Sequence, residues 1–266
     1  MKAAHTFKWL GDEKAYLNEI HIEKLGPLSI GLYDGNTNED AVLAWYDPHG
    51  SWEFVMIFDA EHTIERAKFI IDIICERKEK LLQLFSYPNH LVFHHTHMYL
   101  LSLFTDETFI KKSEKMPEQT DCLICFRKDQ FVYWLSVGEC FIYLFQQESQ
   151  QCKQGRLNEQ QFYERIGRPN IFAVETPCFT SGVRELQRGT NHIVIATDKI
   201  VECREQIFED DRLFYQSLYA EGTLNIKRVL EEVDSWKEAG SATIISWSVD
   251  IENLDCTCEG DERRDK

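Results

Sequence analysis

The stretch that decides the fold is residues 52–63, which read Trp-Glu-Phe-Val-Met-Ile-Phe-Asp-Ala-Glu-His-Thr. Its centre, 54–58, is an uninterrupted run of apolar side chains, and its length suits one buried β-strand. An aspartate follows the strand directly, and the residue pattern changes from Thr63 onward. We therefore predict a strand over 52–58 that ends in a carboxylate and leads into a helix.

The helix is predicted because apolar side chains recur three or four positions apart over 63–85, which places them on one face. Thr63 is its expected N-cap. Pro88 separates it from a second predicted helix over 89–104. Two more helices are expected later in the chain, at 205–219 and 226–236.

Short apolar segments on either side of these helices are typical of strands. Besides 52–58, strands are predicted at 28–33, 41–46, 122–126, 131–137, 140–145, 170–174, 192–197 and 242–249. We expect the first three strands to form a β-meander and Gly138-Glu139 to make a tight hairpin. Hairpins interrupted by helix pairs indicate antiparallel sheets. The predicted class is α+β: a four-layer helix–sheet–sheet–helix sandwich of two antiparallel β-sheets flanked by helix pairs.

Charge excludes one class of function. The chain carries 29 Lys+Arg against 45 Asp+Glu, a net charge of −16, which would repel a nucleic-acid backbone. No apolar run approaches the length of about 20 residues that a membrane span needs. Trp9, Asp12 and Glu13 interrupt the region where a secretory signal would be apolar, so we expect a cytoplasmic protein. Without linkers or repeats, 1–251 is predicted to be a single domain, with 252–266 an acidic, disordered tail.

The nine cysteines are an odd number, and several lie in apolar segments, which favours reduced, buried thiols. The alternative is a zinc site that combines Cys122 and Cys125 with Cys256 and Cys258. However, positions three apart on a strand point to opposite faces, so the first pair could not share one ion. We therefore predict free thiols.

A second candidate metal cluster consists of His94, His95 and His97, within the predicted helix 89–104. Positions 94 and 97 share a helix face. No acidic or cysteine partner lies in the same segment, which favours solvated helix surface over a ligand set. The tryptophans in predicted strands are expected to pack in the core; they are Trp45, Trp52, Trp134 and Trp247.

Five carboxylates gather where predicted strands begin or end: Glu39, Asp40, Asp59, Glu139 and Asp198. Each adjoins residues that should be buried, so each should lie at the edge of a sheet. Singly, such acids are ordinary surface residues. Together, an anionic cluster of oxygen ligands is typical of a site for a hard cation, and we expect Mn²⁺ or Mg²⁺.

Four segments carry a resemblance to a known family. They are Asn38-Glu39-Asp40-Ala41, Phe58-Asp59-Ala60-Glu61-His62, Val137-Gly138-Glu139-Cys140 and Thr197-Asp198-Lys199. In order and spacing they resemble the N-E-D-A, F-D-G-H-G, V-G-D-S and T-D-G landmarks of the protein phosphatase 2C family of metal-dependent Ser/Thr phosphatases. The match extends over 28–249, and the chain is similar to a divergent, bacterial-type member.

The resemblance implies a two-metal centre. By this likeness Asp59 bridges both metals, the Ala60 carbonyl and Asp198 are direct ligands, and Glu39 and Asp40 hold metal-bound waters. Glu139 keeps a carboxylate where some members bind a further, weaker metal.

The implied activity is hydrolysis of phosphoserine or phosphothreonine in proteins by metal-activated water, without a phosphoenzyme. The family's acid histidine aligns with Glu61, and His62 stands one place later. Both are therefore candidate catalytic residues, and the implied partner is a phosphoprotein substrate.

Three departures from the family's pattern weaken the second metal and the substrate site. The stretch 239–243, Ala-Gly-Ser-Ala-Thr, lacks the family's final aspartate. Lys199 replaces the glycine after Asp198, and 33–37 lacks the arginine that holds phosphate. The alternative function is therefore a catalytically impaired pseudophosphatase that acts as a regulatory binding protein, with the enzyme as the leading hypothesis.

Overall fold

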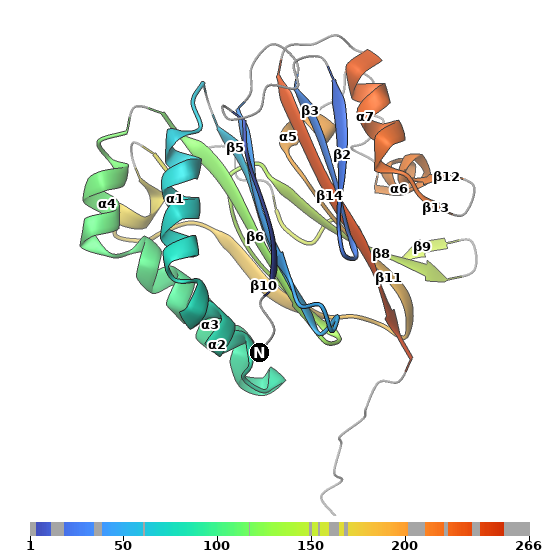
Figure 1. Ribbon diagram of the computed structural model, residues 1–266, viewed down its shortest axis with the longest axis horizontal. Helices are drawn as coiled ribbons and strands as arrows, with labels where there is room; N and C mark the ends of the chain where they lie inside the picture. Colours follow the sequence, from blue (N-terminus) through green and yellow to red (C-terminus); the bar gives the residue numbers. More distant parts are fainter. Residues whose placement is uncertain are drawn as a thin grey trace, which may run out of the picture.

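The structure is a four-layer sandwich of two antiparallel β-sheets covered by helices on both outer faces (Figure 1). This confirms the predicted fold class. The computed structural model describes residues 4–11, 19–34, 39–60, 62–116, 118–148, 151–153, 155–159, 165–167, 170–201, 211–220, 223–235 and 240–252. The single domain over 1–251 stays a prediction, and the predicted tail lies outside the described residues except for Glu252.

Each main sheet has six strands. The first runs in the order β1 (His5–Leu10), β4 (Asp40–Tyr46), β5 (Trp52–Ala60), β6 (Thr120–Lys128), β7 (Phe131–Val137) and β10 (Thr180–Glu185). The second runs in the order β2 (Ile20–Leu25), β3 (Leu28–Asp34), β14 (Ser241–Ile251), β11 (Gly189–Ala196), β8 (Phe141–Glu148) and β9 (Gln151–Lys153). A separate small pairing joins β12 (Tyr219–Ala220) and β13 (Thr223–Leu224).

The helices form the two outer layers. The first sheet is covered by α1 (Glu65–Glu76), α2 (Lys78–Phe85), α3 (Asn89–Phe104) and α4 (Glu107–Ser113) (Figure 1). The second is covered by α5 (Asp198–Val201), α6 (Asp211–Leu218) and α7 (Ile226–Ser235). In the part of the chain that the structure describes, no helix is long and apolar enough to traverse a membrane.

The helix predicted over 63–85 is two helices, which corrects the prediction of one. The break falls at Arg77, where φ is −96° and ψ is 9°, inside a run of charged residues. Thr63 is not the N-cap, because Ile64 occupies that position. The Thr63 hydroxyl still accepts a long hydrogen bond of 3.4 Å from the Glu65 N–H.

Three strand predictions also need correction. Residues 170–174 do not form a strand: Ile171–Ala173 is a 3₁₀ turn, and the Asn170 side chain caps it by accepting from Phe172 N at 3.0 Å. No β-meander opens the chain, since β3 lies in the second sheet beside β2 and β14. Gly138-Glu139 is not a hairpin turn either, because β7 and β8 belong to different sheets and the chain crosses between them here.

Alternation along the strands divides the apolar core into three layers. In β6, for example, Cys122 and Phe126 belong to the layer between the first sheet and its helices, whereas Cys125 belongs to the layer between the sheets. Both cysteines are buried free thiols, and burial raises the pKa of each. The prediction that this pair cannot share one zinc ion is therefore confirmed; Cys256 and Cys258 lie outside the described residues.

The histidines of α3 differ in exposure. His94 and His95 are exposed, as predicted. His97 is partly buried instead, with its Nδ1 atom 3.0 Å from the Tyr133 hydroxyl. The strand tryptophans pack in the core as expected: Trp45, Trp134 and Trp247 are buried, and Trp52 packs partly buried against the same core.

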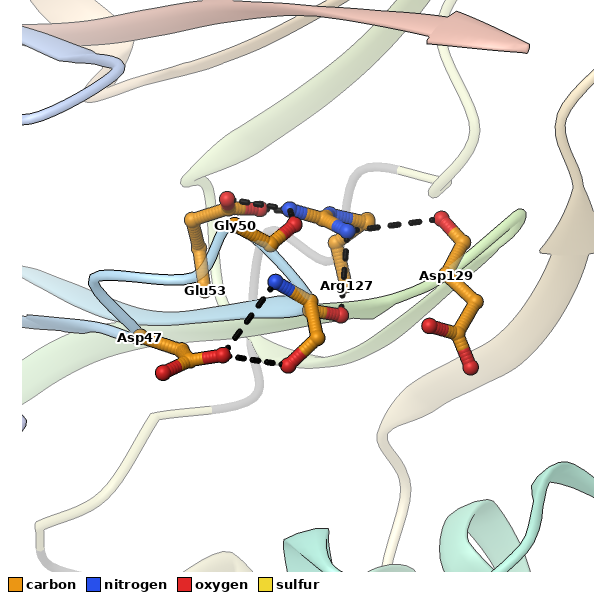
Figure 2. Close-up of polar contacts among 6 residues, drawn as sticks. Asp47, Gly50, Glu53, Arg127 and Asp129 are labelled. Carbon is orange, nitrogen blue, oxygen red and sulfur yellow. Dashed lines mark hydrogen bonds and ion pairs between the residues drawn. The ribbon is translucent and has the colours of Figure 1, made fainter. Parts of the chain in front are cut away.

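One end of the space between the sheets is closed by a buried ion pair. Glu53 at the start of β5 and Arg127 near the end of β6 are direct cross-strand partners, and both are almost fully buried. Arg127 donates from Nε to Glu53 Oε2 at 2.5 Å and from Nη2 to Oε1 (Figure 2). Its remaining N–H groups reach backbone carbonyls, including those of Ser51 at 3.0 Å and Gly50 at 2.9 Å. Charge at this end is therefore matched within the chain.

We predict that Arg127→Met lowers the free energy of unfolding by about 3–5 kcal/mol, because it leaves the Glu53 carboxylate buried without a counter-ion. The double variant Glu53→Leu with Arg127→Met should recover part of that loss, since neither charge remains. Urea denaturation of the three proteins measures both effects. A loss below about 1 kcal/mol in the single variant would contradict the prediction.

Candidate metal centre

The opposite end of the space between the sheets carries a row of three aspartates. Asp40 on β4 is the cross-strand partner of Asp59 on β5, which in turn is the partner of Asp121 on β6. Their neighbours Phe58 and Cys122 face the helices, so the aspartates face the second sheet. Cross-strand side chains start about 5 Å apart, and like charges placed so are destabilising. The row therefore favours a proton or a cation.

Asp198 joins this row from the second sheet. It begins α5 directly after β11, and the Thr197 N–H donates to the Thr243 carbonyl at 3.0 Å, which ties this point to β14. The pKa of Asp59 lies well above its usual value, first because of burial and then because of the negative charges of Asp198 and Asp40. The Asp198 Oδ1 atom is buried without a hydrogen-bond partner.

Asp59, Asp121 and Asp198 line a cleft of about 350 Å³. Of the predicted site residues, it brings together Glu39, Asp59, Ala60, His62 and Asp198. Asp40 and Glu139 lie beside the cleft without lining it, and Glu61 and Asn38 lie outside the described residues. His62 is exposed and has a positive φ of 68°, a conformation uncommon for residues with a Cβ.

Asp40 is turned toward hydroxyl groups. Its Oδ1 accepts from the Ser241 hydroxyl at 2.8 Å, and its Oδ2 accepts from the Thr243 hydroxyl at 2.6 Å and the Thr197 hydroxyl at 3.4 Å. Complete burial raises the pKa of Asp40 to about 7, although these hydrogen bonds oppose the rise. Ser241 and Thr243 belong to the stretch where the resemblance implies a final aspartate. The chain thus has neutral donors there in place of an acid.

Asp121 is a cleft residue that the sequence patterns do not predict. Its Oδ2 accepts from the Glu139 N–H at 3.0 Å, and its Oδ1 lies 3.2 Å from Arg165 Nε. Gly138 makes room for it, since a Cβ at that position would collide with the Asp121 carboxylate, and the glycine φ is 87°. Burial raises the pKa of Asp121 to about 7, although Arg165 and the Glu139 N–H oppose the rise.

Two cationic side chains also line the cleft, Arg165 and Lys199. Arg165 Nη2 lies 3.4 Å from Glu139 Oε2, so this arginine contacts both Asp121 and Glu139. The methylene groups of Lys199 pass beside Gly240, where a Cβ would lie 3.0 Å from Lys199 Cε. The cleft therefore holds internal cations as well as carboxylates.

No three His, Cys, Asp or Glu side chains among the described residues are already grouped to hold a metal ion. Two of the aspartates have partners within the chain: hydroxyls hold Asp40, and Arg165 pairs with Asp121. The donor set nevertheless consists of carboxylate oxygens, which hard divalent ions prefer. Together with the buried Asp198 Oδ1, which has no hydrogen-bond partner, this donor set fits such an ion chemically.

Without metal, stability should fall as pH rises from about 4 to 7. The folded state holds protons on Asp40 and Asp121 up to about pH 7, whereas an unfolded aspartate has a pKa of about 3.9. The folded state thus binds more protons across this window, so raising pH favours unfolding.

We predict that Asp40→Asn flattens this dependence and, at pH 8 in EDTA, raises the free energy of unfolding by on the order of 2 kcal/mol. Urea denaturation of both proteins at pH 5 and pH 8 measures the effect. If the free energy of unfolding of the variant depends on pH as that of wild type does, Asp40 is not the source of this pH dependence.

Comparisons with known proteins find the fold and no close relative. No protein-family model and no curated protein matches the sequence. Among solved structures, a bacterial serine phosphatase has a TM-score of 0.59 at 12% identity, covering 94% of this chain and 99% of that one. The serine-threonine phosphatase 2C from Toxoplasma gondii has a TM-score of 0.57 at 9% identity, covering 92% and 99%.

RsbX, solved in complex with magnesium, has a TM-score of 0.53 at 10% identity, covering 87% of this chain and 100% of that one. Identities this low carry the fold and not the activity. The likeness extends over most of this chain and nearly the whole length of each of these structures. The chain therefore has the fold of the protein phosphatase 2C enzymes.

Proposed function

We propose that this protein is a metal-dependent phosphomonoester hydrolase that acts on phosphoserine or phosphothreonine in proteins. The observation that carries the proposal is the convergence of Asp59, Asp121 and Asp198, from distant parts of the chain, on one cleft. The cleft volume of about 350 Å³ suits a phosphorylated side chain. The phosphatases with the same fold support this choice of reaction.

In this proposal Asp59 and Asp198 hold a divalent ion, Mn²⁺ or Mg²⁺, with the Ala60 carbonyl. Glu39 and Asp40 orient water beside it. A bound ion of this kind supplies the nucleophile by lowering the pKa of water and offsets negative charge on the phosphoryl oxygens. A second ion is expected to bind more weakly, because neutral hydroxyls occupy the place of the family's final acid.

The chain's own polar side chains serve the substrate. In this proposal the exposed imidazole of His62, which lines the cleft, donates a proton to the leaving oxygen. Lys199 and Arg165 provide N–H donors for phosphoryl oxygens. Glu61, the other candidate catalytic residue, keeps its role as a prediction.

A cytoplasmic location accompanies this proposal. The cysteines whose side chains are described, among them the exposed Cys178, are free thiols, which suits a reducing compartment. Bacterial origin stays a prediction.

A second candidate function is a pseudophosphatase that binds a signalling partner. Two observations favour it: the Ser241 and Thr243 hydroxyls already donate hydrogen bonds to Asp40, and Arg165 and Lys199 already line the cleft. The two candidates differ in whether phosphate is released, and activity therefore separates them.

We predict that purified protein with millimolar Mn²⁺ hydrolyses p-nitrophenyl phosphate. Asp59→Asn should lower kcat/KM at least 100-fold, because a carboxylate ligand of the proposed ion is lost. Asp129→Asn, an exposed aspartate in the turn after β6, is the matched control and should keep full activity. Release of phosphate is followed by absorbance. Wild-type protein that releases none would rule out the enzyme and leave the pseudophosphatase.

We also predict that His62→Gln slows hydrolysis of a phosphoserine peptide about 100-fold and slows hydrolysis of p-nitrophenyl phosphate far less. The reason is that an alkoxide needs a proton to leave, whereas nitrophenolate is stable without one. The ratio of kcat values for the two substrates measures this. Equal losses on both substrates would assign His62 to binding or folding.

A further inference from the structure

Two cations could pair with the Asp121 carboxylate: the proposed divalent ion and the Arg165 guanidinium. It stands beside Asp59 in the aspartate row and lines the cleft, where a divalent ion is proposed. It also lies 3.2 Å from Arg165 Nε, in an ion pair that belongs to the chain itself. The resemblance assigns no role to either residue.

Several features of the fold fix the position of the Asp121 side chain. The side chain is only 5% exposed, the Glu139 N–H donates to it, and Gly138 lacks the Cβ that would displace it. A buried carboxylate next to two others is costly unless it serves a cation. The chain has neutral Ser241 and Thr243 where the resemblance implies a final acid, and Asp121 adds a carboxylate to the cleft that the resemblance does not imply.

The backbone beside Arg165 is fixed, and the Arg165 side chain reaches into the cleft. Backbone hydrogen bonds of 3.1 Å in both directions join Thr120 and Ile166 and fix the segment next to the start of β6. The side chain itself is 22% exposed and lines the cleft. Its contacts with Asp121 and Glu139 go through different nitrogen atoms to different carboxylates, and neither is a bidentate pair.

We propose that Asp121 is an additional carboxylate ligand of the divalent ion and that Arg165 is the internal cation that occupies this carboxylate until the ion binds. The proposal rests on the metal site of the proposed function. Ion and guanidinium then compete for Asp121, and binding of the ion frees Arg165 to contact phosphoryl oxygens in the same cleft.

A purely structural ion pair is the alternative, and it predicts different variants. If Arg165 only braces the fold, removing it should leave metal affinity unchanged or weaken it. If Arg165 competes with the ion, removing it should strengthen binding, because a positive charge no longer opposes the ion.

Calorimetric titration with Mn²⁺ tests the competition on the full chain, without reference to turnover. We expect Asp121→Asn to weaken Mn²⁺ binding about tenfold or more and Arg165→Gln to tighten it severalfold. Asp129→Asn, in the turn after β6, and Arg184→Gln, on β10, change exposed residues that do not line the cleft; they carry the same charge changes and should stay within twofold of wild type.

Circular dichroism of each variant checks folding. If Arg165→Gln does not fold, Arg165→Lys, which keeps the charge and loses the planar guanidinium, should bind Mn²⁺ with an affinity equal to or above that of wild type. Wild-type affinity in Asp121→Asn, unchanged or weaker binding in Arg165→Gln, or weaker binding in Arg165→Lys would overturn this inference and leave the proposed function standing. Failure of the wild-type protein to bind Mn²⁺ would overturn both.

Discussion

The pairing register of β4, β5 and β6 is the constraint on which the rest of the structure depends. It places Asp40, Asp59 and Asp121 side by side and turns all three toward the second sheet. At the other end of the same strands, about 20 Å away along β5, Glu53 faces Arg127 instead, and the charges cancel. A shift of one residue in the register would bury the helix-facing apolar side chains on the wrong side, so the apolar core holds the acids together.

The protein relieves the resulting repulsion in two ways, and neither reaches the whole row. Hydroxyls from β14 hold Asp40, which sits deepest, and Arg165 pairs with Asp121 at the other end. Asp59 in the middle is close to Asp198, an acid that adds to the repulsion. The least compensated pair is thus the pair that a divalent ion would hold first. Stability given up at such a point is typical of functional sites.

The inner part of the fold could be predicted from the sequence, and its borders could not. The eight inner strands of the two sheets coincide with predicted strands, whereas β1, β10, β2 and β9, which are the sheet edges, were missed. Inner strands contact apolar layers on both faces, so their sequences are continuous apolar runs. Edge strands such as β10, Thr-Ser-Gly-Val-Arg-Glu, are largely solvated and have no such signature. The crossing at Gly138 was missed because a local turn does not specify which sheet the next strand joins.

The site was predictable to the extent that its residues are marked by their own neighbours in sequence. Asp59 and Asp198 each follow an apolar strand, and their order along the chain suffices to find them. Asp121 precedes its strand and looks like any solvated strand end until its partner is known to be Asp59, 62 positions earlier. No sequence pattern marks Arg165, and among the described residues the bridge between Thr120 and Ile166 holds the neighbouring backbone beside the start of β6. Residues that act through long-range pairing therefore become visible only when the register is known, and the two residues of the proposed competition, Asp121 and Arg165, are of this kind.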